Sequence, residues 1–283
     1  MAVSGEPLIA WDSRQSTPNL EWEASLLRPL NGLKVLDMTR VLAGPVATRT
    51  LAGFGANVLR IDPPGWEEAN IAPDVTLDKK CARLDLTAKD DREIFEGLLS
   101  EADVLIHGYR PGALETLGYG DKARLKLAPS LIEITLNAYG WSGPWQGRRG
   151  FDSLVQMSSG IADAGAQWAS KDMPYPLPVQ ALDHATGYLM AAAAIRAITQ
   201  RAVGAGARSA RLSLARTAEL LCSNPQTRSQ ATAFEALAPD FSSKVEQTPW
   251  GAAKRLLPAL VIDGAPMEWA SPACNLGTSA PQW

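Results

Sequence analysis

Short apolar segments alternate with helix-like segments through the first half of the chain, and loops rich in glycine and proline separate them. Four apolar segments have the length of buried strands: residues 33–38, 57–61, 103–106 and 131–136. Four intervening segments have the pattern of helices: residues 46–54, 89–100, 113–117 and 121–127. This alternation predicts an α/β domain built on a Rossmann-like parallel sheet with helices on both faces.

The loops that follow the expected strands predict where a ligand binds. Parallel sheets bind ligands beyond the carboxyl ends of their strands. In this chain those ends are four loops rich in glycine and proline: residues 39–45, 62–65, 107–112 and 137–144. Gly53 and Gly55 follow a helix instead of opening one, so they do not form a dinucleotide fingerprint, and no nicotinamide cofactor is expected.

Composition divides the chain into three parts. Residues 1–28 are polar with isolated tryptophans, and we expect them to form an N-terminal arm. Residues 29–222 form the α/β domain, which includes a further strand near 211–214 and a helix after it. Residues 223–283 predict a helical segment followed by an extended C-terminal strap, residues 249–283.

The overall composition is that of an ordinary globular protein, with 46% apolar and 20% charged residues and a net charge of −3. The 27 Lys and Arg are scattered among 30 acidic residues, which argues against a nucleic acid partner. Two histidines and three separated cysteines (Cys81, Cys222 and Cys274) argue against a metal site and fit a reducing compartment. Because no apolar run has membrane-spanning length and no signal-peptide pattern opens the chain, we expect a cytoplasmic protein without a membrane partner.

Five acidic residues crowd the region after the second expected strand: Asp62, Glu67, Glu68, Asp74 and Asp78. Clustered carboxylates can bind a cation, but this spacing matches no calcium-binding loop. The pattern therefore favours a solvated loop.

Asp183 stands where an extended apolar stretch meets an Ala-rich helix that is expected to end near Gly204. An aspartate in this position is a favoured N-cap, and the helix dipole stabilises its charge. A carboxylate held there can also attack an activated acyl group if it borders a cavity. The local sequence favours the cap and leaves the nucleophile open. For His107 and His184 it favours structural roles, although His184 could tune the neighbouring charge.

The motifs of residues 28–220, taken in order, resemble the class III coenzyme A transferases, the CaiB/BaiF family that includes formyl-CoA transferase and carnitine CoA-transferase. The similar segments include GLKVLDMTRVLAGP at 32–45, GANVLRIDPPG at 55–65, KKCARLDL at 79–86, YRPGAL at 109–114 and GFD at 150–152. The resemblance implies an acyl-CoA:carboxylate CoA-transferase with an α/β fold.

Carried over by position, the family's catalytic aspartate falls on Asp183. The resemblance implies that this carboxylate attacks an acyl-CoA thioester to give a mixed anhydride, then an aspartyl-CoA thioester from which a carboxylic acid collects the CoA. It also implies CoA contacts at Val41, Lys79, Tyr109 and Arg110. The expected substrates are acyl-CoA and a carboxylic acid, with no tightly bound cofactor. The expected assembly is a homodimer or a complex with a related subunit.

Two alternatives stay open. Racemases of this family pair the aspartate with a histidine in the Gly-x-Asp segment, where this chain has Phe151, and phenylalanine cannot exchange a proton. An acyl-CoA racemase or isomerase is therefore disfavoured. Pro63, Gly108 and Asn137 replace a basic residue, an asparagine and a lysine of the family. Family members also carry a small domain inserted after the region of Leu221, so a non-catalytic homologue that scaffolds a full-length partner is the second alternative.

Overall fold

The computed structural model describes residues 2–13, 22–204, 208–224 and 235–283. Seven strands of this part form one sheet in the order β1-β7-β6-β5-β2-β3-β4. Their bounds are β1 Ala10–Ser13, β2 Lys34–Met38, β3 Asn57–Asp62, β4 Lys79–Arg83, β5 Val104–His107, β6 Ile132–Asn137 and β7 Arg208–Ser213. Neighbouring strands pair in parallel except β1, which pairs antiparallel with β7. The predicted α/β fold is confirmed.

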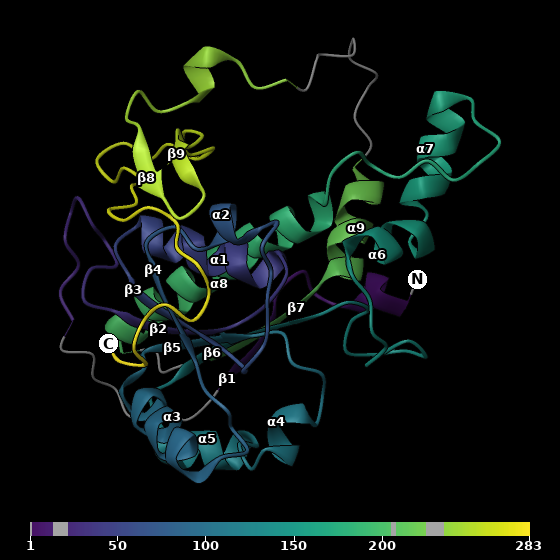
Figure 1. Ribbon diagram of the computed structural model, residues 1–283. Helices are drawn as coiled ribbons and strands as arrows, with labels where there is room; N and C mark the ends of the chain where they lie inside the picture. Colours follow the sequence, from purple (N-terminus) through teal and green to yellow (C-terminus); the bar gives the residue numbers. More distant parts are fainter. Residues whose placement is uncertain (1, 14–21, 205–207, 225–234) are drawn as a thin grey trace.

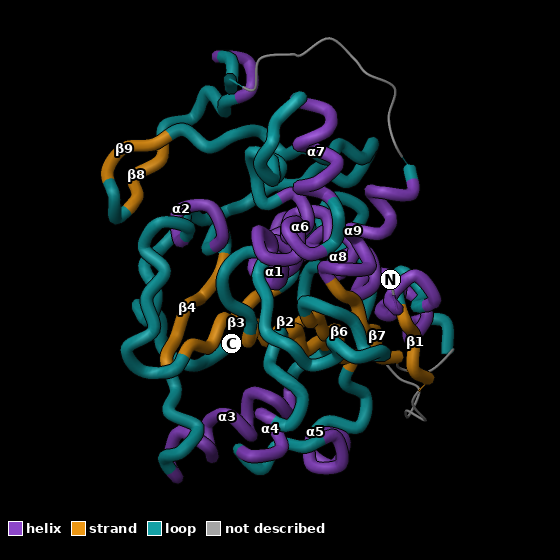
Figure 2. Tube along the Cα trace, turned by 90° about the vertical axis from the view of Figure 1, so that its right-hand side faces the viewer, coloured by secondary structure: helices purple, strands orange, loops and turns teal. Residues whose placement is uncertain are grey.

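Helices cover both faces of the sheet (Figures 1 and 2). One face carries α1 (Ala43–Gly53) and the long helix α8 (Ala181–Ala202), and the other carries α3 (Lys89–Glu101), α4 (Ala113–Thr116) and α5 (Asp121–Leu127). The remaining helices, α2 (Ala72–Val75), α6 (Asp152–Ser158), α7 (Ile161–Ala169) and α9 (Leu214–Ser223), lie on the same side as α1 and α8.

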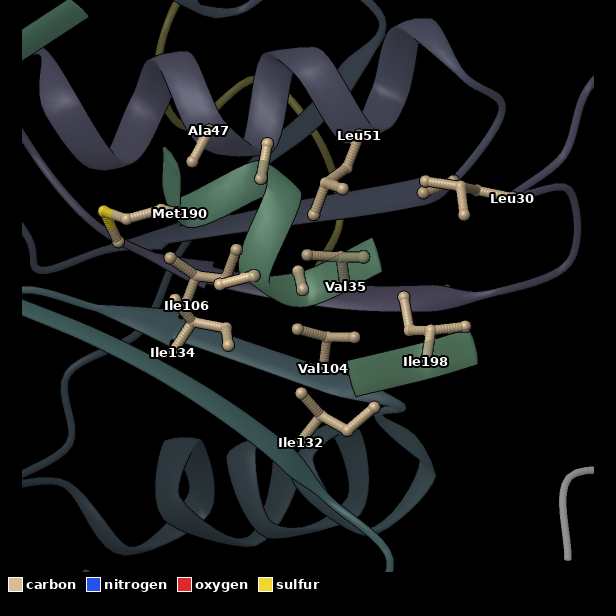
Figure 3. Packing of buried hydrophobic residues seen from close by; sticks show 14 of the residues in the cluster. Leu30, Val35, Ala47, Leu51, Val104, Ile106, Ile132, Ile134, Met190 and Ile198 are labelled. Atoms are coloured by element: carbon tan, nitrogen blue, oxygen red, sulfur yellow. The ribbon is translucent and has the colours of Figure 1, made fainter. Parts of the chain in front are cut away.

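The central strands are apolar on both faces because both faces are buried. Side chains alternate along β2, so Val35 packs against α1 and α8 while Leu36 packs on the side of α3. Figure 3 shows the first of these cores, in which Leu51 of α1, Met190 of α8 and Ile106 of β5 lie together. Full burial of each such side chain contributes about 1.5–3 kcal/mol.

Two strands of this sheet were not predicted. β1 lies within the expected N-terminal arm and extends the sheet at one edge, so part of this arm belongs to the α/β domain. β4 forms the opposite edge, and its sequence of two lysines, a cysteine, an alanine and an arginine lacks a strand pattern.

The expected helical segment after residue 222 falls partly on 225–234, which lies outside the described residues. The described remainder before the end of the chain contains a 3-10 helix, Ala238–Asp240, and a hairpin of β8 (Glu246–Thr248) and β9 (Gly251–Ala253). The hairpin lies partly within the predicted strap, residues 249–283. Beyond β9 the described chain contains no further helix or strand and reaches back to the edge of the sheet at β4 (Figure 1).

Candidate active site

A cavity of about 350 Å³ opens at the carboxyl ends of the strands, where the sequence predicts a binding site. The loops after β2, β5 and β6 form most of its wall, and the first turns of α1 and α8, Trp66 after β3 and Leu214 of α9 complete it. Val41, Tyr109, Arg110 and Asp183 all line this cavity. The structure therefore brings together four of the five site residues expected from the sequence.

Lys79 is the fifth, and it lies outside the cavity lining. Its Nζ is fully buried and contacts Asp37 Oδ2 at 3.0 Å, Thr48 Oγ1 at 2.6 Å and Pro45 O at 3.0 Å. These contacts use all three protons of an ammonium group, so in this arrangement Lys79 has none to offer a phosphate.

The role of Lys79 in the fold is to neutralise Asp37. Burial alone would raise the pKa of Asp37, but the Lys79 ammonium and the Arg60 guanidinium outweigh it and hold the pKa below its usual value. The charged Asp37 in turn accepts hydrogen bonds from the backbone N (2.9 Å) and the Oγ1 (2.5 Å) of Thr39. Thr39 lines the cavity, so Lys79 supports the cavity wall from behind.

Asp183 is the third residue of α8, and the N-cap position is Gln180. The N-cap prediction is therefore wrong. Its physical reason lies in α6, where the Asp152 carboxylate accepts the backbone N–H of Asp183 at 2.9 Å. A first-turn donor of α8 is thus satisfied by a side chain 31 residues away, and the Asp183 side chain is left to face the cavity.

Asp183 is only 5% exposed. Burial, and after it the negative charge of Asp152, raise the pKa of Asp183 to about 7. Both effects act in the same direction, because burial and a nearby negative charge each disfavour the ionised form of a carboxyl group. The site thus holds a carboxylate of unusually high basicity at the boundary of a cavity, a common property of functional carboxylates.

Gln156 of α6 fixes the position of Asp152. Its Nε2 donates to Asp152 Oδ1 and to the backbone O of Val179, the latter at 3.0 Å. Its Oε1 accepts the backbone N–H of Leu177 at 2.8 Å. Gln156 therefore ties α6 to the segment that leads into α8, and Asp152 and Asp183 are held in one arrangement.

One rim of the cavity is an aromatic and cationic stack. The guanidinium of Arg40 lies 5.0 Å from the ring centre of Trp66 and 5.1 Å from that of Tyr109. Arg40 Nη2 also donates to Tyr109 Oη at 2.8 Å. The stack orients the Tyr109 ring and holds a positive charge at the rim.

Val41 lies beside this stack in a left-handed backbone conformation, with φ of +66°. A β-branched residue rarely adopts this conformation. Its N–H donates to Glu68 Oε1 at 2.6 Å, and Glu68 Oε2 accepts a hydrogen bond from Arg60 at 2.6 Å. Arg60 is fully buried and also pairs with Asp62.

These contacts correct the solvated-loop prediction for two members of the acidic cluster, because the buried Asp62 and the half-buried Glu68 are ion-pair partners of Arg60. Glu67 and Asp74 are exposed, as a solvated loop requires, and Asp74 pairs with Arg49. The described residues contain no group of three or more His, Cys, Asp or Glu side chains arranged to hold a metal ion.

Phe151 lines the cavity and is 65% exposed, at the position where the family's racemases carry histidine. Neither histidine lines this cavity. His184 is half-buried, and burial lowers its pKa. His107 contacts Glu133, with its Nε2 3.0 Å from Oε1. Gly108 and Asn137, two of the departures from the family pattern, do line the cavity.

Four residues of this site were not among the sequence candidates: Arg40, Trp66, Glu68 and Asp152. Asp152 had a signal, since it ends the GFD motif, and Arg40 directly precedes Val41. Trp66 had none, and Glu68 was noted only as a member of the acidic cluster, because the contacts of both residues join loops after different strands.

The sequence model of CoA-transferase family III matches residues 30–240. The chain belongs to this family. The match covers all strands of the sheet except β1, and it includes every residue of the cavity named above.

The names of several similar proteins describe them as transferases that act on CoA thioesters. Acetyl-coenzyme A transferase nodX of Hypoxylon pulicicidum is 32% identical over 72% of this chain and 34% of the relative. The probable fatty acyl-CoA transferase Rv3272 of Mycobacterium tuberculosis is 32% identical over 62% of this chain and 47% of its own length. A crystal structure of Rv3272 superposes with a TM-score of 0.64 at 32% identity, covering 69% of this chain and 56% of the other.

A CAIB/BAIF family protein from Brucella suis has the same fold, with a TM-score of 0.62 at 22% identity. The matched part of this chain spans less than half the length of the two curated relatives, nodX and Rv3272. Within the described ranges, no helix has the length and apolar content needed to span a bilayer.

Proposed function

We propose that this chain catalyses acyl-CoA:carboxylate CoA transfer with Asp183 as the nucleophile. The observation that carries the proposal is the Asp183 carboxylate, which is 5% exposed and borders a cavity whose lining also includes Arg40, Arg110 and Arg148. Arginines bind phosphates well, and coenzyme A carries phosphates. The family and the names of the relatives support the same reaction class.

In the proposed reaction a carboxylate oxygen of Asp183 attacks the thioester carbon of acyl-CoA. The C–S bond breaks, which gives a mixed anhydride and the CoA thiolate. The thiolate then attacks the aspartyl carbonyl of the anhydride, so the donor acid leaves and an aspartyl-CoA thioester forms. An incoming carboxylate reverses these two steps, takes the CoA and restores Asp183.

The high basicity of Asp183 suits this role. A carboxylate whose pKa is about 7 is a stronger nucleophile once ionised than one at the ordinary value. The first turn of α1 borders the same cavity through Ala43 and Gly44. First-turn N–H groups have no partner within their helix, so they are suited to stabilise the oxyanion that develops in each step.

For CoA binding we retain Val41, Tyr109 and Arg110, and we add Arg40, whose guanidinium is already oriented by Tyr109. We leave out Lys79 because its ammonium group is occupied by Asp37, Thr48 and Pro45. We extend the proposal to acyl-CoA and a carboxylic acid as substrates, a homodimer or a complex with a related subunit, and a cytoplasmic location.

Trapping tests the proposal. The protein is incubated with acetyl-CoA or succinyl-CoA and then with hydroxylamine, which converts an aspartyl anhydride or thioester into a hydroxamate. Peptide mass spectrometry is expected to locate the hydroxamate on Asp183. Asp183→Asn is expected to lose it, and Asp172→Asn, a substitution at an exposed aspartate, is expected to retain it.

Calorimetry with CoA supplies the second readout. If the wild-type chain forms no hydroxamate and also binds no CoA, the proposal is contradicted. CoA binding without a hydroxamate would instead support the non-catalytic homologue.

A further inference from the structure

Two cysteine thiols from segments far apart in the sequence meet at the edge of the sheet. Cys81 lies in β4 and is fully buried, and Cys274 lies in the C-terminal strap and is half-buried. The Cys274 Sγ–H donates to Lys79 O at 3.6 Å, two residues before Cys81 on β4, and neither cysteine is in a disulfide. The strap therefore brings a free thiol to the strand that carries Cys81.

Hydrogen bonds on both sides of this pair hold the strap against β4 and the turn before it. Thr76 Oγ1 accepts the N–H of Cys274 at 3.0 Å and donates to Cys274 O at 2.9 Å. Ser279 N donates to Cys81 O at 2.8 Å, and Ser279 Oγ accepts the N–H of Cys81 at 3.1 Å. These hydrogen bonds fix the backbone of each cysteine where the strap crosses β4.

The two thiols have different acidities. The neighbouring Cys81 thiol lowers the pKa of Cys274; burial opposes this, while Thr278, Thr76 and the charge of Lys79 favour it. The Cys274 thiol, together with burial, raises the pKa of Cys81. Cys274 is also the more exposed of the two, so it is the thiolate that an oxidant can reach.

We propose that Cys81 and Cys274 are a modification site at which a low-molecular-weight disulfide, such as oxidised glutathione, forms an internal disulfide. The Cys274 thiolate attacks one sulfur of the oxidant, whose S–S bond breaks and releases one glutathione thiolate. Cys81 then loses its proton, and its sulfur attacks the Cys274 sulfur and releases the second glutathione thiolate. The protein loses two electrons and two protons, and the oxidant becomes two molecules of glutathione.

The disulfide fixes the strap to the body of the domain. Trp269 of the strap donates its indole N–H to Arg49 O of α1 at 2.8 Å, and Met267 packs in the same core as Leu51. A bond between Cys81 and Cys274 closes a long loop of chain, which restricts the unfolded state strongly. The inference is independent of CoA transfer, since every residue that carries it lies outside the cavity lining.

The test compares the reduced wild-type chain with the chain incubated in oxidised glutathione. Free thiols are then alkylated, and peptide mass spectrometry is expected to detect a Cys81–Cys274 cross-linked peptide. The oxidised chain is expected to unfold about 5–10 °C above the reduced chain, and dithiothreitol is expected to reverse both changes.

Three variants define the control set. Cys222→Ser removes the exposed cysteine and is expected to oxidise and gain stability as the wild type does. Cys81→Ser is expected to stop at a mixed disulfide on Cys274, and Cys274→Ser is expected to form no internal bond. A wild-type chain that forms no Cys81–Cys274 peptide, or whose unfolding temperature does not rise on oxidation, would overturn the proposal whether or not the variants fold.

Discussion

The carboxylate of Glu68 accepts the backbone N–H of Val41 at 2.6 Å and so holds a β-branched residue in the left-handed region, with φ of +66°. This conformation costs about 1–3 kcal/mol and persists only where contacts enforce it. We expect Glu68→Ala to let Val41 relax away from the cavity and to weaken CoA binding about tenfold, which corresponds to about 1.4 kcal/mol.

Glycine adopts the left-handed region without strain, so Val41→Gly provides a matched background. In that background Glu68→Ala is expected to weaken CoA binding only about threefold, instead of about tenfold. Calorimetry in a double-mutant cycle measures this difference. Glu67→Ala, at an exposed neighbour that pairs with Arg83, is the control and should leave affinity unchanged. Equal losses in both backgrounds would exclude the strain argument. If CoA does not bind, the same double-mutant cycle is measured as free energies of unfolding, which tests the contact of Glu68 with the N–H of Val41.

Replacement of Asp183 is expected to stabilise the chain. The pKa of Asp183 is about 7 in the folded state, against 3.8 for the free side chain, so the folded state retains a proton that the unfolded state loses. Stability therefore falls as pH rises from about 4 to about 7 and stays lower above that. Asp183→Asn removes this penalty and should raise the free energy of unfolding at pH 8 by up to about 4 kcal/mol. Urea unfolding at pH 4 and pH 8 measures the effect, and a gain that is no larger at pH 8 than at pH 4 would refute it.

Asp152 is expected to act on the reaction through Asp183. Asp152→Asn keeps an oxygen for the N–H of Asp183 but removes the negative charge that raises the pKa of Asp183. Because the carboxylate attacks only when ionised, the rise of kcat/KM with pH should move to lower pH in this variant. A purely structural role would reduce the rate without moving the midpoint of the pH profile.

The parallel sheet and the cavity could be predicted because they depend on local patterns. The apolar segments 33–38 and 131–136 have the length of buried strands, and the loops after such strands must meet at one edge. The start of α8 at Ala181 could not be predicted from the local sequence. The backbone N–H of Asp183 in its first turn is satisfied by Asp152, which only the folded chain brings near.

Two further differences between the sequence prediction and the structure also come from partners that are distant in the sequence. The C-terminal strap covers β4 and stabilises it through contacts such as that of Cys81 with Ser279. The five residues of β4 carry no sequence pattern that would predict this contact. Lys79 matches the family's motif, but its partner Asp37 is 42 residues away, so the sequence could not tell a buried ion pair from a phosphate contact.

Acid is expected to weaken the chain through Glu133. Burial alone would raise the pKa of Glu133, but His107 and Arg124 lower it to about 2, against 4.5 for the free side chain. The stabilisation is therefore present above about pH 4.5 and is lost as pH falls towards 2, with a total of about 3 kcal/mol. Glu133→Gln should be less stable than wild type at pH 7, and this difference should shrink towards pH 3. An equal difference in urea unfolding at both pH values would contradict the prediction.

Close packing of α1 on α8 is expected to depend on Gly187. A Cβ added there would lie 2.6 Å from Ala43 O and 2.8 Å from Val46 Cβ, so Gly187→Ala must push the two helices apart. We expect a loss of about 1–3 kcal/mol in the free energy of unfolding. Gly187 is one turn after Asp183 on the same face of α8, and Ala43 lines the cavity, so the variant should also trap less hydroxamate on Asp183. Gly97→Ala in α3 is the matched control, because its added Cβ meets nothing within 4 Å and should be neutral or stabilising. A Gly187→Ala chain as stable as the Gly97→Ala chain would show that α1 and α8 tolerate the wider spacing.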